Sequence, residues 1–125
     1  MILDHKHLIV RATVNNPPRD VEVAKAWITV LVGQIGMRLV DKLPENPTGF
    51  YSDMPGNQGI TAIAIIETSH VTLHIWDEED PAVIQFDVYS CSDFQPSEVL
   101  AHFQIFEPVS LRYKFIDRNS GLEEL

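Results

Sequence analysis

The chain has 125 residues, 45% of them hydrophobic, which is enough for one hydrophobic core and too few for two ordinary domains. Its 18 acidic residues outnumber nine basic ones, and the net charge of −9 argues against a nucleic-acid or anionic membrane partner, because both select clustered Lys and Arg. Cys91 is the one cysteine and cannot form an internal disulfide, and no segment reads as a secretory signal or membrane span, so the sequence predicts a cytoplasmic protein.

The first predicted elements are a strand and a helix. Residues 7–14 alternate between apolar and polar side chains, which is typical of a half-buried strand. Asn16, followed by two prolines, predicts a helix N-cap. Gly33 and Gly36 mark the end of that helix. Its apolar stripe recurs at three- and four-residue steps: Ala24, Trp27, Ile28, Leu31 and Ile35.

A second strand is predicted at residues 37–43, and a long loop follows at 44–59. The loop holds three prolines, three glycines and the aromatic pair Phe50 and Tyr51. Loops of this length in a small domain are typically functional, so we expect it to form a lid.

The second half of the chain predicts further strands around an acidic turn at 77–80. Pro96 begins a second helix, and Pro108 ends it. The strands are expected at 59–66, 71–76, 83–89 and 111–116.

The order β-α-β-β-β-β-α-β, with one strand fewer if 37–43 is irregular, predicts an α+β fold. We expect a two-layer α/β sandwich, in which two helices cover one face of an antiparallel sheet. The other face is then available for self-association. A single domain is predicted at 1–118, with a flexible C-terminal tail at 119–125.

The stretch 67–76 reads Glu-Thr-Ser-His-Val-Thr-Leu-His-Ile-Trp, and Cys91 follows in Tyr-Ser-Cys-Ser-Asp. This pattern resembles the active-site signature of the bacterial and archaeal S-adenosylmethionine decarboxylases, close to E-S-H-[LV]-[ST]-[IL]-H-T-W-P-E. The resemblance is specific over 59–91 and looser over 7–118. One position departs from it: the family has glutamate before the serine, whereas this chain has Thr68, with Glu67 one place earlier.

The family is self-processing and pyruvoyl-dependent. In it, the serine matching Ser69 attacks the carbonyl of the preceding residue, the chain breaks between Thr68 and Ser69, and the new N-terminus becomes a pyruvoyl group. That ketone forms a Schiff base with the substrate amine and acts as the electron sink. The resemblance thus implies decarboxylation of S-adenosylmethionine for spermidine synthesis, a pyruvoyl cofactor without a metal, and a homodimer.

The resemblance also assigns roles to individual residues. His74 matches the histidine that takes the α-proton of the serine-derived ester, and Cys91 matches the cysteine that returns a proton to the substrate. Thr61, eight residues before Ser69, matches a serine that assists processing. Strand alternation predicts that His74 faces away from the main apolar layer.

Four more residues are predicted to bind substrate. Phe50 and Tyr51 are expected to stack on the adenine ring, as aromatic residues before the processing site do in the family. Glu67 and His70 flank the predicted cleavage site.

Structural roles remain as alternatives. A serine between strands is typically a turn residue, and a cysteine after a strand is typically a small buried hydrophobe. Two other functions stay open: a pyruvoyl decarboxylase acting on arginine or ornithine, and an unprocessed, non-catalytic homologue that binds a ligand or partner. His5 and His7 have a spacing that suits a metal on one strand face, but the sequence offers them no evident Cys, Asp or Glu partner.

Overall fold

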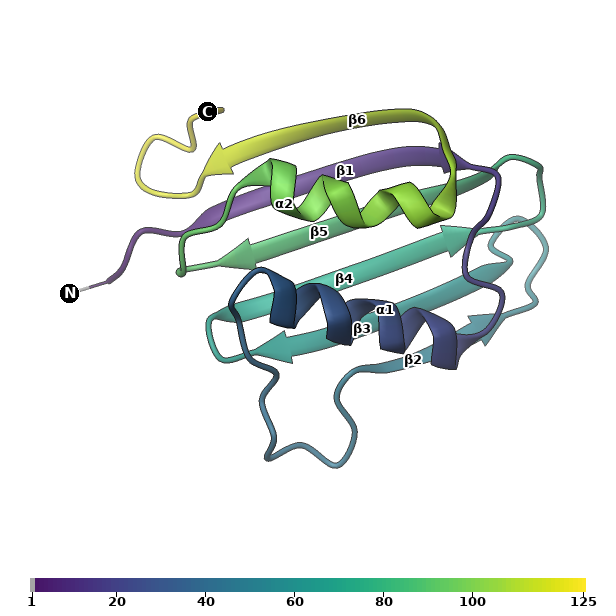
Figure 1. The fold of residues 1–125 in the computed structure, drawn as a ribbon, viewed down its shortest axis with the longest axis horizontal. Coiled ribbons are helices and arrows are strands. Elements are labelled where there is room, and N and C mark those ends of the chain that lie inside the picture. The colour runs from purple at the N-terminus through teal and green to yellow at the C-terminus, as the bar shows by residue number, and fades with distance from the viewer. Residues whose placement is uncertain (1) are drawn as a thin grey trace.

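The computed structural model describes residues 2–125 as one six-stranded antiparallel sheet with helices on one face (Figure 1). The strand order is β2-β3-β4-β5-β1-β6. This confirms the predicted α+β two-layer sandwich. The elements are β1 (Lys6–Val14), α1 (Val21–Gln34), β2 (Thr48–Ser52), β3 (Gly59–Ile66), β4 (Ser69–Trp76), β5 (Ala82–Ser90), α2 (Pro96–Ala101), the 3-10 helix η1 (His102–Phe106) and β6 (Pro108–Asp117).

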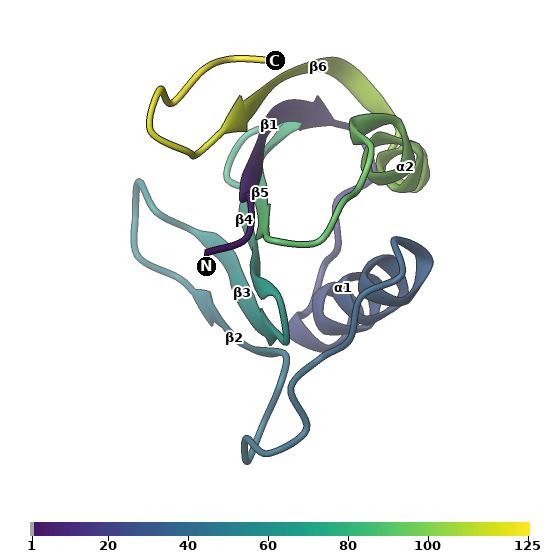
Figure 2. The same cartoon turned by 90° about the vertical axis from the view of Figure 1, so that its left-hand side faces the viewer.

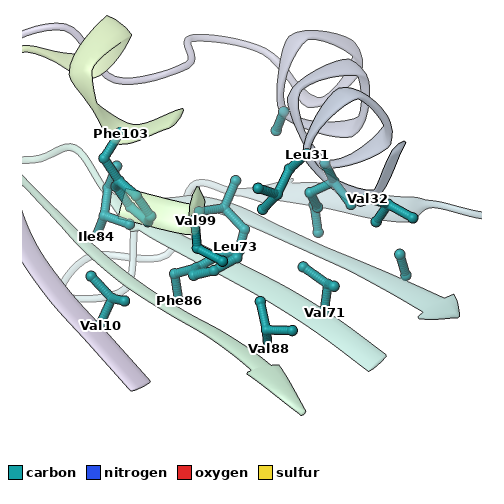
Figure 3. Packing of buried hydrophobic residues seen from close by; sticks show 14 of the residues in the cluster. Val10, Leu31, Val32, Val71, Leu73, Ile84, Phe86, Val88, Val99 and Phe103 are labelled. Atoms are coloured by element: carbon teal, nitrogen blue, oxygen red, sulfur yellow. The ribbon is translucent and has the colours of Figure 1, made fainter. Parts of the chain in front are cut away.

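The core lies between the helices and the sheet face that they cover. In β1, β3, β4 and β5, alternate side chains enter this core and the others face outward. Trp27 of α1 packs edge-on against Phe86 and Phe103, with ring centroids 5.4 and 5.2 Å apart. Burial of each such ring contributes roughly 1.5–3 kcal/mol. The core residues labelled in Figure 3 are Val10, Leu31, Val32, Val71, Leu73, Ile84, Phe86, Val88, Val99 and Phe103.

Figure 2 shows both helices on the same side of the curved sheet, with no helix on the other face in residues 2–125. We call that uncovered side the outer face. Across residues 2–125, neither helix combines the length and apolar character needed to cross a lipid bilayer.

The predicted N-cap at Asn16 is wrong. Helix α1 begins at Val21, and Asp20 is its cap, because the Asp20 side chain accepts a hydrogen bond from the Val23 N–H at 2.9 Å. Asn16 is instead tied to the other helical segment: its side chain donates to the carbonyl of Ile105 at 3.0 Å. Residues 15–19 therefore connect β1 to α1 and are not part of the helix.

The predicted strand at 37–43 is also wrong. Only Leu39 forms a bridge there, opposite Ile66 of β3. The neighbouring edge of β3 is occupied by a side chain: the Asn46 amide donates to the Ile65 carbonyl at 2.7 Å and its oxygen accepts from the Ile65 N–H at 3.0 Å. The sixth strand is β2, which lies inside the predicted 44–59 loop, so that loop is really two shorter connections around an edge strand.

Residues 119–125, where we expect a flexible tail, turn back along β6. The Leu125 N–H donates to the Phe115 carbonyl at 2.7 Å, and the Asp117 N–H donates to the Glu123 carbonyl at 2.8 Å. The side chains of this segment are exposed. Its flexibility stays a prediction.

Candidate active site

The outer face carries most of the residues singled out in the sequence. On β4, His70, Thr72, His74 and Trp76 alternate with the buried Val71, Leu73 and Ile75, which confirms that His74 faces away from the core. The strand register sets their neighbours. Thr72 lies opposite Asp87 of β5, and His74 lies opposite Thr61 of β3.

The predicted cleavage bond lies in the tight turn between β3 and β4. Ser69 has φ = +137°, a backbone conformation that residues with a Cβ rarely adopt and that stores strain. The Thr68 carbonyl oxygen accepts a hydrogen bond from the Cys91 N–H at 3.0 Å. The carbonyl next to Ser69 is therefore polarised by a fixed donor.

The same turn is tied to the end of β5 through side chains. The buried Ser90 hydroxyl donates to Thr68 Oγ1 at 2.9 Å and accepts from the Ser92 N–H at 3.0 Å. Ser69 pairs with Ser90 in the ladder, and the half-buried free thiol of Cys91 follows directly. The structure thus brings Thr68, Ser69 and Cys91 together at one end of the sheet.

His74 and Thr61 lie at the other end of the outer face. The Thr61 hydroxyl and His74 Nδ1 are hydrogen-bonded at 3.2 Å, and His74 stacks on Trp76 with ring centroids 5.9 Å apart. His74 also lines an open cavity of about 570 Å³ with Arg11, Gln85 and Asp87, among other residues. These groups suit an imidazole that exchanges a proton with a bound molecule.

Ser69 and His74 are not neighbours within one chain. They are five residues apart on the same extended strand. At the rise of a β-strand this separation is about 16 Å. The structure therefore does not bring the predicted nucleophile and the predicted base together in a single copy.

The predicted adenine-binding residues separate onto two faces. Phe50 pairs with Thr61, which places it on the outer face near His74, and its side chain is 59% exposed. Tyr51 alternates to the opposite face, where its hydroxyl donates to Asp77 at 3.0 Å. Desolvation and this hydrogen bond raise the pKa of Tyr51, so the hydroxyl stays protonated.

The acidic turn at 77–80 pins the loop between β2 and β3. The Glu78 carboxylate accepts from the Gly56 N–H at 2.6 Å and from the Gln58 N–H at 3.1 Å. The Trp76 indole N–H donates to Asn57 Oδ1 at 2.9 Å. Part of the predicted lid is thus held against the His74 end of the outer face.

Asp87 is a site residue that sequence reasoning missed. Its Oδ2 accepts from His7 Nε2 at 2.7 Å and from His70 Nε2 at 3.2 Å, while Thr72 donates to Oδ1. Burial acts to raise the pKa of Asp87, but the hydrogen bonds from His7 and Thr72 and the charge of the two imidazoles lower it overall. The alternation in the sequence places His7, His70 and Asp87 on the outward side of three strands. Only the order of those strands in the sheet shows that the three side chains meet.

The structure corrects the sequence reading of the paired histidines. His7 does have an acidic partner, Asp87, and it groups with His70 rather than with His5, whose tilted ring lies 5.1 Å from that of Tyr89. His5 and His7 therefore do not converge on one cation. Glu67 has an exposed side chain, and its backbone N–H donates to the Arg38 carbonyl at 2.9 Å.

Comparison with known proteins gives consistent matches. The S-adenosylmethionine decarboxylase family matches residues 6–119. An S-adenosylmethionine decarboxylase proenzyme of Archaeoglobus fulgidus is 30% identical over 92 residues, which cover 70% of this chain and 79% of that protein. One of Clostridium botulinum is 36% identical over 59 residues, covering 44% of this chain and 49% of that protein.

A solved structure matches the fold over nearly its whole length. The crystal structure of the adenosylmethionine decarboxylase from Aquifex aeolicus superposes with a TM-score of 0.71, covering 94% of this chain and 92% of that one, at 16% identity. At that identity the likeness concerns the fold, which is the same arrangement of sheet and helices.

Proposed function

Because this chain belongs to the S-adenosylmethionine decarboxylase family, we propose that it cleaves itself between Thr68 and Ser69 and decarboxylates S-adenosylmethionine for polyamine synthesis. The family match over residues 6–119 confirms the family resemblance noted in the sequence. The relatives from Archaeoglobus and Clostridium are named proenzymes, which supports a processing step.

The observation that carries this proposal is the geometry of the Thr68 carbonyl. Attack by Ser69 Oγ on that carbon places negative charge on the Thr68 oxygen, which already accepts from the Cys91 N–H at 3.0 Å. A donor held in place before the charge develops is an effective form of electrostatic catalysis. Release of the strained φ of Ser69 also favours opening of the bond.

The cleavage balances without an external oxidant. The Ser69 hydroxyl adds to the carbonyl, the bond from Thr68 carbon to Ser69 nitrogen breaks, and that nitrogen takes the hydroxyl proton, leaving an ester. A base then removes the α-proton of Ser69, and Thr68 leaves as a carboxylate. Water converts the remaining unsaturated amine into the pyruvoyl ketone and ammonia.

The pyruvoyl group supplies an electron sink for the pair left when carbon dioxide departs. Around it, this chain contributes Cys91 as the proposed proton donor to the substrate α-carbon and His70 beside the ketone-bearing end. His74 suits the earlier task of removing the Ser69 α-proton, because imidazole side chains commonly act as general bases.

We further propose that two copies of the chain complete each site. Ser69 and His74 of one copy are about 16 Å apart by strand rise, so His74 can serve as the base only for Ser69 of another chain. The outer face is uncovered by helices in residues 2–125 and exposes Ile9, Ile63 and Ile65 at 43%, 39% and 47%. A homodimer through this face buries those side chains and sets His74 and Thr61 against the partner's cleavage turn.

Recognition of the substrate is assigned to the outer face at the His74 end. Phe50 offers an exposed ring on the same face as Thr61 and His74, suited to stacking on adenine. Tyr51, Glu67 and His70 remain predicted contacts. Tyr51 lies on the opposite face of the edge strand, so any contact it makes with substrate involves the end of the strand rather than its outer surface.

The proposal is tested by the intact mass of the purified protein under denaturing conditions. Cleavage gives fragments 1–68 and 69–125, the second lighter than a serine terminus requires, whereas Ser69→Ala stays a single 14.2 kDa species. Incubation with S-adenosylmethionine, arginine or ornithine then identifies the product. An intact wild-type chain after prolonged incubation contradicts the proposal and favours the unprocessed homologue. Agmatine or putrescine as the product would show that the substrate is arginine or ornithine and not S-adenosylmethionine.

A further inference from the structure

The start of β4 is held to its neighbours by one carboxylate. Both outward-facing residues that follow Ser69, His70 and Thr72, donate to Asp87 of β5, one to each carboxylate oxygen. His7 of β1 donates to the same carboxylate at 2.7 Å. Asp87 therefore joins three strands, and we call this group the Asp87 clasp (His7, His70, Thr72 and Asp87).

The hydrogen-bond directions within the clasp follow from the ionised Asp87 carboxylate, to which the Nε2 of each imidazole donates whether the ring is neutral or protonated. Arg118 Nη1 lies 3.4 Å from His7 Nδ1, and because a guanidinium only donates, this contact favours the Nε2–H tautomer of a neutral His7. Arg118 itself is held 4.1 Å above the Tyr89 ring. Ionised Asp87 only accepts, so His70 also donates through a protonated Nε2.

This arrangement disfavours a metal ion in the clasp. The ligand atoms of His7, His70 and Asp87 lie within 4.8 Å of one another, which is a spacing that suits a cation. Both Nε2 atoms are already used in hydrogen bonds to Asp87, however, so a cation would have to displace both protons and break both bonds. The clasp is built to hold side chains in place.

Cleavage removes one of the restraints on the start of β4, the covalent connection to β3. In the intact chain, residue 69 is held by the turn that connects β3 and β4. Once the bond before Ser69 is broken, β4 begins at a free chain end, and free ends fray unless they are tied down. The first side chains available to tie it on the outer face are those of His70 and Thr72.

We propose that Asp87 is a positioning residue that keeps the new terminus at residue 69 in register after cleavage, because it accepts hydrogen bonds from His70 and Thr72. This inference rests on the proposed self-cleavage. It assigns Asp87 to the mature protein, because cleavage removes the covalent β3–β4 connection and leaves residues 69 and 70 held only by backbone pairing with β3 and β5 and by the clasp.

The test compares amide hydrogen exchange of residues 70–76 in cleaved and uncleaved backgrounds. Asp87→Ala removes the acceptors, and we expect exchange in the cleaved protein to rise about tenfold or more, because the local opening free energy falls. In the uncleaved Ser69→Ala background the same change should raise exchange by less than about threefold, since the turn stays closed. A purely structural role predicts equal increases in both backgrounds.

Two further variants keep the test decisive. Asp87→Asn retains an oxygen for the imidazoles and an amide that donates to Thr72, so it should restore slow exchange if hydrogen bonding is the cause. If Asp87→Ala does not fold, Thr72→Val replaces it, because that change removes the hydroxyl that donates to Asp87. Asp93→Ala is the matched control, because Asp93 lies just past β5 and its 95% exposed side chain pairs with Lys6 at 3.1 Å, away from the clasp.

The outcomes separate the two proposals. Cleaved Asp87→Ala with exchange like wild type, or with equal increases in both backgrounds, overturns the inference and leaves the proposed function standing. A wild-type chain that stays intact in the mass spectrum overturns the self-cleavage and the inference together.

Discussion

The two ends of the outer face differ in what they lack. The Ser69 end has a strained serine, our proposed nucleophile, and a donor on the neighbouring carbonyl, but its imidazoles, His7 and His70, already donate to Asp87. The His74 end has an imidazole braced by Thr61 beside an open cavity, but no cleavage bond. Each end supplies what the other needs, which is the physical argument for a second copy of the chain.

The largest expected effect is at the Ser69 end. Cys91→Pro removes the N–H that the Thr68 oxygen accepts, and self-cleavage should slow by about 10²–10³-fold, the usual cost of an oxyanion donor. Cys91→Ala keeps that N–H, so it should cleave at the wild-type rate and lose only the decarboxylation step. Time courses of intact mass measure both.

Thermal unfolding of the two Cys91 variants serves as the control, because proline also restricts the backbone. If folded Cys91→Pro cleaves as fast as Cys91→Ala, the Cys91 N–H does not assist self-cleavage. The Ser69 end would then lack the donor that the proposal assigns to it.

A smaller effect is expected at the His74 end. Thr61→Val removes the hydroxyl that braces His74 Nδ1, which costs on the order of 1 kcal/mol, or roughly five- to tenfold in the cleavage rate. Thr13→Val is the matched control, since Thr13 is also on an outer-face strand position but bonds Ser110. Equal rates for the two variants would remove Thr61 from the account.

Periodicity predicted most of the fold because apolar alternation and the 3.6-residue repeat report burial directly. The strands β1, β3, β4, β5 and β6 and both helices are predicted from the sequence pattern. The edge strand β2 did not, because its residues are mostly exposed and include Gly49. At 37–43, Met37 and Leu39 pack on the core and pairing with β3 stops after two backbone hydrogen bonds, Val40 N–H to the Ile65 carbonyl and Glu67 N–H to the Arg38 carbonyl, while the Asn46 side chain takes the Ile65 N–H.

The site was predictable to a different extent. The residues around the Thr68–Ser69 bond were found from the resemblance of one contiguous segment, and Cys91 lies beside that bond in the structure. Asp87 and its partnership with His7 were not found, because β1 pairs with β5 although 67 residues separate Val14 from Ala82. The distance between Ser69 and His74 follows only from the structure, in which both residues lie on one extended strand.

The central claim, that each site uses two copies, is tested most directly by mixing two inactive chains. Ser69→Ala has no nucleophile and His74→Ala has no base, so each variant alone should stay at full length. Co-expressed with different tags and purified through both, they should yield cleavage between Thr68 and Ser69 of the His74→Ala chain, served by His74 of its partner. Co-purified chains that both remain intact, or cleavage of His74→Ala alone, would contradict the account.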